Sequence, residues 1–379
     1  MRRLKTQISQ IISDINLRYL LNQRDQREID SIKFFLTFST APIERVINFN
    51  LSWLPDLKKI IHMKITGFTF AKNTSKLYIP VKPSIESVLP IVDEFVVLMG
   101  DNDADDTTED ILKSIDSPKL SIHRSVWDKE NYKGTVTFAH QTDLAKDLCN
   151  GDWLFYIQAD EVLHEKYHAR IVDAIKTYND DKRVEGFLFQ YKHFWGDYWH
   201  YHSSYGWYPR EIRIIRNDKD IHSWRDAQSF RKYTGINYSM QDYTGRANSR
   251  KLNVIELDAE IYHYGGSRPP ELMTIKRKGV IKVNFGTDKK KSDSLLKGLE
   301  EKYDYGPLDR LKKFEGTHPA PMKQWIDNFY WKKDLQYSGP RNKNRPKFKH
   351  ERLKYILLTP ISRIWPFRDW IGFRNYRKI

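Results

Sequence analysis

Short apolar runs alternate with longer segments of helical periodicity through the middle of the chain. The apolar runs predict strands over Ile65–Phe70, Glu94–Met99, Lys119–Ser125 and Trp153–Ile157. The segments between and after them predict helices over Ser84–Ile91, Thr107–Ile115, Thr137–Cys149 and Lys166–Tyr178. Alternation of this kind predicts an α/β fold, with a mostly parallel sheet and helices on both faces.

The pattern becomes strand-rich after Val184. Strands are predicted over Gly186–Tyr191 and Ile212–Arg216, as a mixed extension of the sheet. Beyond Pro269-Pro270 the chain is charged and has a helical pattern. We therefore expect one α/β domain over residues 63–285 and a basic, mostly helical C-terminal region over residues 286–379.

Residues 1–62 precede this pattern and are predicted to form a helical N-terminal extension. Five apolar residues fall on one helical face: Ile8, Ile11, Ile12, Ile15 and Tyr19. Two interpretations stay open. The segment is a helical pair that docks on the core or on a partner, or it is an artefact of an upstream start site.

Cysteine content and hydropathy limit the class of protein. The single cysteine, Cys149, excludes an internal disulfide and a cysteine-based metal cluster, and it fits a reducing compartment. No run of eighteen apolar residues is present, and the basic N-terminus lacks the apolar core of a signal peptide. We expect a cytoplasmic protein.

The net charge of +15 is concentrated near the C-terminus. Residues 339–379 hold twelve Lys or Arg and two acidic residues, mixed with Trp, Phe, Leu and Ile. This mixture favours a peripheral position on an anionic membrane surface at its inner face. A basic helix packed on the domain is the second interpretation, and nucleic acid is the least favoured partner.

Two predicted strands run directly into acidic residues. The strand ending at Met99 is followed by the acidic loop 101–110, and the strand ending at Ile157 is followed by Asp160 and Glu161. Open α/β sheets bind ligands at this carboxyl edge, where carboxylates suit hard divalent cations and a diphosphate completes the shell. This is the local chemistry of a nucleotide-sugar transferase. A solvated acidic turn is the alternative.

Three further segments follow in order: Glu211–Asn217, Trp224–Gln228 and Ile261–Gly265. With the two acidic strand ends, they make the chain resemble the family 2 glycosyltransferases, in the bacterial branch that builds surface polysaccharides. The resemblance runs from about Met63 to about Pro321. It implies the GT-A nucleotide-binding fold and inverting transfer from a nucleotide-sugar donor to a saccharide or lipid-linked acceptor.

The resemblance also implies a metal site for Mn²⁺ or Mg²⁺. Gln158-Ala159-Asp160 stands where the family has Asp-X-Asp, so Gln158 is a departure on the donor side and Asp160 becomes the principal ligand. Glu161 assists through water, and His263 faces the metal or the diphosphate. A satisfied strand-end histidine is the alternative for His263.

For the nucleotide sugar, the resemblance points to the ends of the first two strands and to later residues. Asp101 and Asp105 are candidates for the base or ribose, with Asp103 behind them and Asn73 as a looser match. Asp143 replaces the family's asparagine facing the donor sugar, and Arg268 is a candidate phosphate contact. The alternative for the acidic loop is helix capping by Asp106 or Thr107.

Asp226 is the candidate catalytic base, because related transferases carry an acidic residue facing the acceptor at this place. A structural ion pair with Arg225 is the alternative. The aromatic and histidine-rich segment Tyr191–Tyr208 is interpreted as an acceptor-side flap or as packing.

A function of another class stays open. A catalytically degenerate GT-A-like protein, acting as a basic membrane- or nucleic-acid-binding module, would fit the missing first acid and the charged tail. A nucleotidyltransferase is less favoured, because the chain has no glycine-rich phosphate loop.

Overall fold

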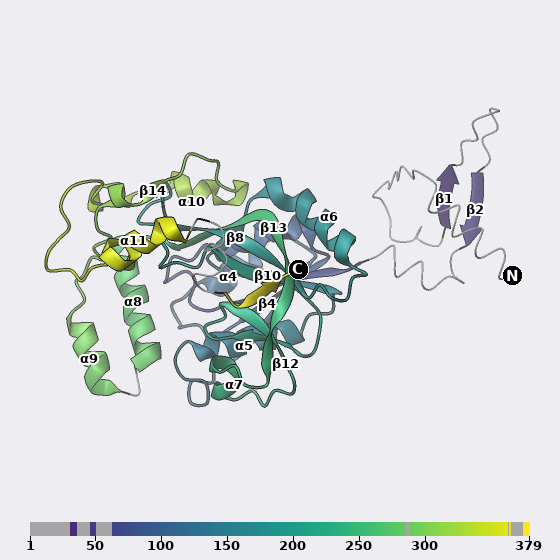
Figure 1. The fold of residues 1–379 in the computed structure, drawn as a ribbon, viewed down its shortest axis with the longest axis horizontal. Coiled ribbons are helices and arrows are strands. Elements are labelled where there is room, and N and C mark those ends of the chain that lie inside the picture. Colours follow the sequence, from purple (N-terminus) through teal and green to yellow (C-terminus); the bar gives the residue numbers. More distant parts are fainter. Residues whose placement is uncertain (1–30, 36–45, 51–62, 286–287, 363, 365–373) are drawn as a thin grey trace. The chain divides into compact units, whose positions relative to one another are not determined.

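The computed structural model describes residues 31–35, 46–50, 63–285, 288–362, 364 and 374–379 (Figure 1). The chain divides into two compact units, residues 1–62 and 63–379. In the first unit, β1 (Ser31–Phe35) pairs antiparallel with β2 (Val46–Asn50). The predicted helical face over residues 8–19 lies outside the described residues. Where the extension is described it forms strands, so the prediction of a helical extension is wrong there.

The core of the second unit is a group of four parallel strands. Its order is β6-β3-β4-β5, formed by β3 (Ile65–Ala71), β4 (Glu94–Met99), β5 (Leu120–Arg124) and β6 (Trp153–Tyr156). The connecting helices are α3 (Val81–Val88), α4 (Thr108–Lys113) and α5 (Val136–Asp147), with α6 (His168–Tyr178) further on. The predicted α/β alternation is confirmed, because buried apolar strands and amphipathic helices give local signals.

The strand order reverses direction at β3. The chain moves from β3 outward to β4 and β5, and α5 then returns it to β6 on the other side of β3. The carboxyl ends of β3 and β6 therefore open a crevice at a topological switch point, the usual ligand position in such sheets.

The rest of the sheet is a mixed extension. It contains β8 (Gly186–Trp195), β10 (Arg210–Arg216) and the long β13 (Ser249–Gly266). Strand β10 runs antiparallel to both β6 and β8, whereas β13 runs parallel to β8. Across the described sheet, parallel and antiparallel pairings are both frequent, so the sheet is mixed, and the predicted parallel character holds for the core β6-β3-β4-β5.

Short elements finish the sheet and position the site. Strand β7 (Glu161–Leu163) pairs antiparallel with β13, β9 (His200–His202) pairs with β8, and β15 (Tyr376–Lys378) runs parallel to β13. A hairpin of β11 (Ile221–Trp224) and β12 (Ser229–Tyr233) extends the edge, with α7 (Met240–Thr244) beside it.

Apolar side chains fill both faces of the sheet. Helices α3, α4 and α6 cover one face, over a cluster that includes Phe95 and Phe155. Helix α5 covers the other face with the β11–β12 hairpin, over a cluster that includes Phe68 and Phe230. Helices on both faces, as predicted, leave the carboxyl edge of the strands as the open side for chemistry.

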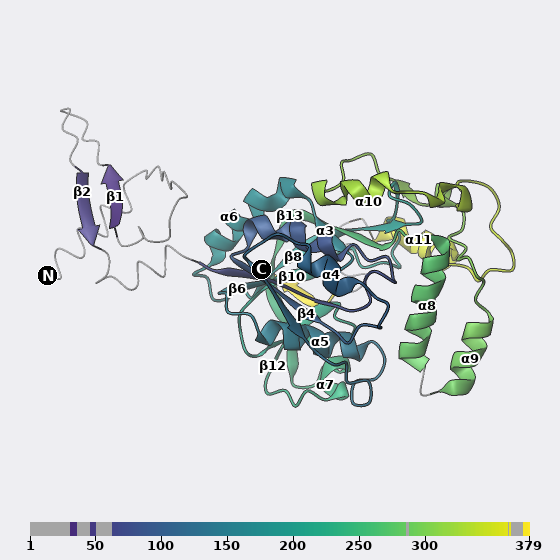
Figure 2. The same cartoon turned by 180° about the vertical axis from the view of Figure 1, so that it is seen from behind.

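The C-terminal region departs from the predicted mostly helical character. Helix α8 (Pro270–Phe285) pairs with α9 (Lys289–Lys297) (Figure 2). Among the later residues that the structure describes, the only α-helices are α10 (Lys323–Asp327) and α11 (Leu353–Ile361), with 3₁₀ turns and the short β14 (Lys312–Lys313). Most described residues from 298 to 352 are irregular. None of the helices in the described part is both long and apolar enough to cross a bilayer.

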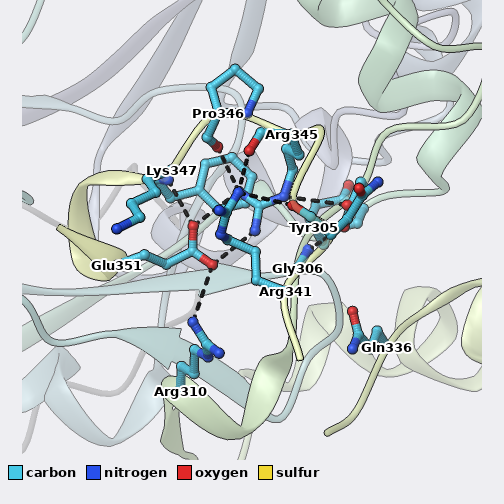
Figure 3. Close-up of polar contacts among 12 residues, drawn as sticks. Tyr305, Gly306, Arg310, Gln336, Arg341, Arg345, Pro346, Lys347 and Glu351 are labelled. Carbon is cyan, nitrogen blue, oxygen red and sulfur yellow. Dashed lines mark hydrogen bonds and ion pairs between the residues drawn. The ribbon is translucent and has the colours of Figure 1, made fainter. Parts of the chain in front are cut away.

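A buried ion network fixes the irregular stretch before α11 (Figure 3). The Arg345 guanidinium donates to both carboxylate oxygens of Glu351, at 2.8 and 3.0 Å, and its Nε lies 3.3 Å from Asp304. The Phe348 ring stacks 3.9 Å from the guanidinium. Such bidentate pairing fixes the orientation of the segment that contains Arg345 and Glu351. Helix α11 begins directly after this segment.

Candidate active site

A tight turn after β6 presents Asp160 at the carboxyl edge of the sheet. The Gln158 carbonyl accepts from the Ser84 hydroxyl at 3.0 Å and from the Glu161 amide at 2.9 Å. The Gln158 amide in turn donates to the Glu161 carboxylate at 3.1 Å. The turn is therefore closed from both sides, which fixes where the Asp160 side chain points.

The Asp160 carboxylate meets a histidine from β13 and a lysine from α8. Its Oδ1 lies 3.6 Å from His263 Nε2, and its Oδ2 lies 3.3 Å from Lys276 Nζ. A Cβ atom on Gly265 would stand only 2.6 Å from His263 Nε2 and 2.7 Å from Asp160 Oδ2. Glycine at this position therefore keeps open the space in which the two groups converge.

The charges around Asp160 keep it ionised. Burial alone would raise the pKa of Asp160, but the charges of Lys276 and Arg268, with that of His263 when it is protonated, outweigh burial and hold that pKa well below its usual range. Burial and the charge of Arg268 lower the pKa of Lys276 to about 8, although Asp160 opposes this change. The site is thus a carboxylate held among cationic groups, an arrangement that also suits a diphosphate.

Hydrogen bonds fix the tautomer of His263. His193 Nε2 lies 2.8 Å from the Tyr208 carbonyl, which can only accept, so His193 carries its proton there. Burial lowers the pKa of both His193 and His263, so both rings are neutral. His193 Nδ1 then accepts from His263 Nδ1, 3.0 Å away. This leaves the lone pair of His263 Nε2 directed toward Asp160.

These two residues fit a divalent cation. A carboxylate and an imidazole lone pair face each other across 3.6 Å, with no proton available to join them. In the described part of the chain, no group of three or more carboxylate, imidazole or thiol side chains gathers as a complete metal site. Mg²⁺ and Mn²⁺ commonly take one or two protein ligands and fill the remaining positions with phosphate oxygens and water.

Glu161 does not belong to this pair, which corrects the prediction that it assists the metal. Both of its carboxylate oxygens accept from Arg213, at 2.7 and 2.8 Å, and one also accepts from the Tyr191 hydroxyl at 2.8 Å. Glu161 and Arg213 are fully buried. The pair is therefore a structural tie between β7 and β10.

The predicted nucleotide edge gathers at the ends of β3 and β4. Asn73 has a left-handed backbone (φ 52°), and its side chain accepts from the Asp103 amide at 2.8 Å. Asp101 pairs with Lys72 at 2.7 Å and accepts from the Trp127 amide at 3.0 Å. Burial would raise the pKa of Asp101, but these partners lower it. Asp101 is therefore anionic, about 41% exposed, and positioned after β4, beside the end of β3.

The other acids of this loop have separate roles. Asp103 and Asp105 both pair with Lys76, and both are exposed. Asp106 accepts from the Thr108 amide at 2.9 Å, so it caps α4 as the alternative interpretation predicted. Capping by Asp106 leaves the neighbouring carboxylates at the surface.

Asp143 does not face the donor side, contrary to the prediction. It is 2% exposed, and its carboxylate accepts from the Ser223 amide at 2.7 Å and from the Tyr243 hydroxyl at 3.0 Å. The His222 ring lies 3.2 Å away. Asp143 therefore ties α5 to β11 and α7, and it has no exposed surface for a sugar.

Asp226 lies at the tip of the β11–β12 hairpin. Its neighbours Arg225 and Ala227 both have left-handed backbones, with φ of 62° and 57°, a strained arrangement for non-glycine residues. Gln158 Nε2 donates to the Ala227 carbonyl at 3.1 Å. The Asp226 side chain is exposed at the hairpin tip, and desolvation by the surrounding protein raises its pKa, against the charge of Arg225. No ion pair joins Asp226 to Arg225 within the described residues, so the predicted alternative finds no support.

Arg268 is placed behind the site. Its guanidinium is fully buried and donates to the carbonyls of Gly265, at 3.0 Å, and Leu77. It adds positive charge near Asp160, but it is not exposed for the predicted phosphate contact. Lys276 has that exposure, at 26% of its side chain.

Sequence reasoning missed Lys276 and the role of His193. The role of His193 follows from the pairing of β8 with β13, which places His193 opposite His263, and no pattern within either segment predicts that register. Lys276 follows Pro270 by fewer than two helical turns, so a helix starting at the end of β13 returns it to the site.

Comparisons with known proteins point in one direction. No protein-family model matches the chain. It is 30% identical over 86 residues to a family 92 glycosyltransferase of Oryza sativa subsp. japonica, and 28% identical over 119 residues to the uncharacterized glycosyltransferase RP128 of Rickettsia prowazekii. These alignments cover 22% and 31% of this chain, and 14% and 35% of the two relatives.

Solved structures of S. aureus TarS also align. TarS 1-349 in complex with UDP is 17% identical, with a TM-score of 0.34, over 62% of this chain and 70% of that one. The structure of TarS itself is 14% identical to this chain, with a TM-score of 0.32, over 62% of this chain and 43% of TarS. TM-scores of this size do not establish a shared fold. The sequence similarity of this chain is with glycosyltransferases, over limited segments of each relative.

Proposed function

We propose that this protein is an inverting glycosyltransferase of the GT-A type. It moves a sugar from a nucleotide-sugar donor to a saccharide or lipid-linked acceptor in polysaccharide biosynthesis. The observation that carries the proposal is the Asp160–His263 pair at the carboxyl edge of the sheet, beside the switch point of β3 and β6. The similarity to curated glycosyltransferases supports the same class of reaction.

In this proposal the donor lies along the carboxyl edge. The nucleoside contacts Asp101 and Asn73 at the ends of β3 and β4, and the diphosphate reaches Asp160 and Lys276. Asp160 and His263 would hold Mn²⁺ or Mg²⁺. When bound, the ion would neutralise the charge of the leaving diphosphate.

The Asp226 carboxylate serves as general base from the hairpin tip. It accepts the proton of the acceptor hydroxyl as that oxygen attacks the anomeric carbon from the side opposite the diphosphate. The bond from the anomeric carbon to the diphosphate oxygen breaks, and its electron pair leaves with the diphosphate. A single displacement inverts the anomeric configuration, and the raised pKa of Asp226 makes its carboxylate a stronger base for this step.

Calorimetric titration with UDP, GDP, CDP and dTDP, each with Mn²⁺ and with EDTA, tests the donor site. We expect micromolar, Mn²⁺-dependent binding of one nucleotide, and we expect Asp160→Ala to abolish it. Binding of none of the four to the full chain would overturn the proposal and favour a degenerate transferase.

Asp226→Asn tests the base. We expect nucleotide affinity within about twofold of wild type and a sugar-transfer rate lowered at least about 100-fold, the usual effect of losing a general base. Asp220→Asn, on the same hairpin at the other end of β11, is the matched control. Equal rates in wild type and Asp226→Asn would remove Asp226 from this role.

We also propose that α11 places the enzyme on an anionic membrane at its cytoplasmic face. Tyr355 and Thr359 dock the helix against Tyr205, through a ring contact at 6.0 Å and a 3.0 Å hydrogen bond. The other face carries apolar side chains that are 41–69% exposed: Leu353, Ile356, Leu357 and Ile361. Exposed Arg352 and Lys354 flank them.

Vesicle sedimentation tests this surface. We expect Ile356→Ser with Leu357→Ser to weaken binding to phosphatidylglycerol vesicles at least about tenfold, because it removes the apolar contact. Leu144→Ser with Leu148→Ser, at partly exposed positions at the end of α5, is the control. Unchanged binding, or equal binding to phosphatidylcholine vesicles, would contradict the proposal.

A further inference from the structure

A hollow of about 330 Å³ lies beside the hairpin turn that carries Asp226. Its walls come from β10, the β11–β12 hairpin, the start of β13 and the residues just before β15. Four of its lining residues are cationic: Arg225, Arg246, Lys251 and Arg374. The donor site described above uses none of them.

The positive charge of this pocket is not balanced by neighbouring acids. Within the described part of the chain, none of the four cations forms an ion pair with a carboxylate. Burial, followed by the charges of Arg374 and Arg246, lowers the pKa of Lys251. The Trp224 ring lies 4.3 Å from the Arg225 guanidinium and 5.9 Å from that of Arg246, which orients both groups.

The floor of the pocket contains buried polar groups that are not fully paired. Glu211 is 2% exposed, and its Oε1 accepts from Gln228 Nε2 at 2.8 Å. Among the described residues, Arg374 Nε is buried without a hydrogen-bond partner. The Ser229 hydroxyl lies beside the Glu211 carboxyl group, and neither Ser229 Oγ nor Glu211 Oε2 has a partner outside this pair. Buried polar groups are normally paired, so the unpartnered Arg374 Nε beside the Glu211–Ser229 pair indicates a site that a ligand completes.

We propose that this pocket binds a phosphate group of the acceptor and thereby presents the acceptor hydroxyl to Asp226. The inference rests on the proposed function, which it deepens by naming the acceptor class. Three guanidinium groups, one ammonium and the Ser229 hydroxyl offer more donors than the two oxygens of a carboxylate can accept. A tetrahedral dianion uses them better, because arginine forks match phosphate oxygens in pairs.

Glu211 strengthens the choice of ligand. Burial raises the pKa of Glu211 to about 8, with the nearby charge of Asp226 adding to the rise. At neutral pH the side chain is therefore a protonated donor, which fits a phosphate oxygen and does not repel it. Arg225 and Gln228, which line the pocket, flank Asp226 in the same turn, so a phosphate anchored there leaves the attached sugar beside the base.

Calorimetry of the full chain in EDTA, with inorganic phosphate and glucose 6-phosphate as probes, tests the pocket. We expect Arg246→Ala with Lys251→Ala to weaken both probes at least about tenfold. Lys176→Ala with Lys182→Ala removes the same charge at exposed positions on and just after α6, and should change affinity less than about twofold. Equal phosphate affinity in wild type and the pocket variant would overturn the inference.

Three further probes identify the ligand. Glucuronate should bind more weakly than glucose 6-phosphate, and equal or tighter binding would overturn the choice of phosphate. Tight, variant-sensitive binding of a single-stranded oligonucleotide at physiological salt would replace the acceptor by nucleic acid. Farnesyl phosphate in micelles distinguishes the two possible sources of the phosphate. If farnesyl phosphate binds more tightly than glucose 6-phosphate, a lipid carries the phosphate group; if it binds more weakly, a sugar carries it.

The outcome is separable from that of the proposed function. Asp160→Ala should abolish Mn²⁺-dependent nucleotide binding and leave phosphate binding intact. If no nucleotide binds while phosphate affinity still depends on Arg246 and Lys251, the transferase proposal fails and the anion pocket stands. If a nucleotide binds and the pocket variant retains wild-type phosphate affinity, the pocket inference fails alone.

Discussion

Glu211 should make the stability of this protein fall as the pH rises. Its pKa is raised from 4.5 to about 8 by burial in the floor of the cationic pocket. Between these values the folded protein holds a proton that the unfolded chain has released. The free energy of unfolding then falls by about 1.4 kcal/mol per pH unit, which reaches about 5 kcal/mol at pH 8 and above.

Glu211→Gln removes this titration while keeping the shape of the side chain. Near pH 4.5 wild type and variant should be similarly stable, because both carry a neutral group. As the pH rises, wild type loses stability and the variant does not, so the difference in favour of the variant grows to about 4 kcal/mol at pH 7.5. Above pH 8 the difference should level off.

Urea unfolding followed by circular dichroism, at several pH values from 5 to 9 in a buffer without phosphate, measures this difference. Glu315→Gln removes a carboxylate from an exposed position and is the matched control. A stability difference between Glu211→Gln and wild type that stays constant with pH would refute the reasoning. So would a difference that shrinks as the pH rises.

Three other substitutions test the site and its support. Gly265→Ala should weaken Mn²⁺-dependent nucleotide binding at least about tenfold by calorimetry, because the added Cβ would stand 2.6 Å from His263 Nε2. His193→Phe should weaken Mn²⁺ binding about 10- to 100-fold, because His263 loses the group that fixes its tautomer. Arg213→Ala should lower the free energy of unfolding by about 3–5 kcal/mol in urea titration, because it leaves Glu161 buried without its charge partner.

Matched controls separate these effects from general damage. Gly279→Ala adds a methyl group where the surroundings are open, and should leave nucleotide binding unchanged. His123→Phe changes an exposed histidine on β5 and should leave Mn²⁺ affinity unchanged. Wild-type Mn²⁺ affinity in His193→Phe would contradict the tautomer argument, and wild-type stability in Arg213→Ala would contradict the buried-pair argument.

The alternating elements were predictable because their signals are local. Strand β4 was predicted at its observed bounds, and the others within a few residues. The directions of β8, β10 and β13 in the sheet were not predictable, because they depend on pairings between segments that are distant in the sequence. Periodicity within one segment does not report the strand on which it will pack.

In the candidate site, too, residues with local signals were predicted and residues with distant partners were not. Asp160 and His263 come together as predicted, since each ends an apolar run at the same edge. Glu161 and Asp143 were misassigned because their partners lie far along the chain. Glu161 accepts hydrogen bonds from Arg213, which lies 52 residues later in the chain. A sequence pattern does not show which of two adjacent acidic side chains is buried.

Lys276 is a residue of the site that was not predicted. It belongs to a helix whose sequence is charged and typical of a solvent-exposed helix, so its neighbours gave no indication of a role in the site. Its position follows from the start of α8 directly after β13, a connection that turns the helix back over the strand end. The proposed roles of Asp101, Asp103, Asp105 and Asp226 stay predictions.

The hydrogen bond from Gln158 to the Ala227 carbonyl couples the turn after β6 to the tip of the β11–β12 hairpin. An amide can donate to that carbonyl, whereas an ionised aspartate at the same place would set oxygen against oxygen. An aspartate at position 158 would therefore disturb the turn that presents Asp226. A substitution at position 158 and one in the hairpin turn should then have non-additive effects on the free energy of unfolding, because the two segments share this contact.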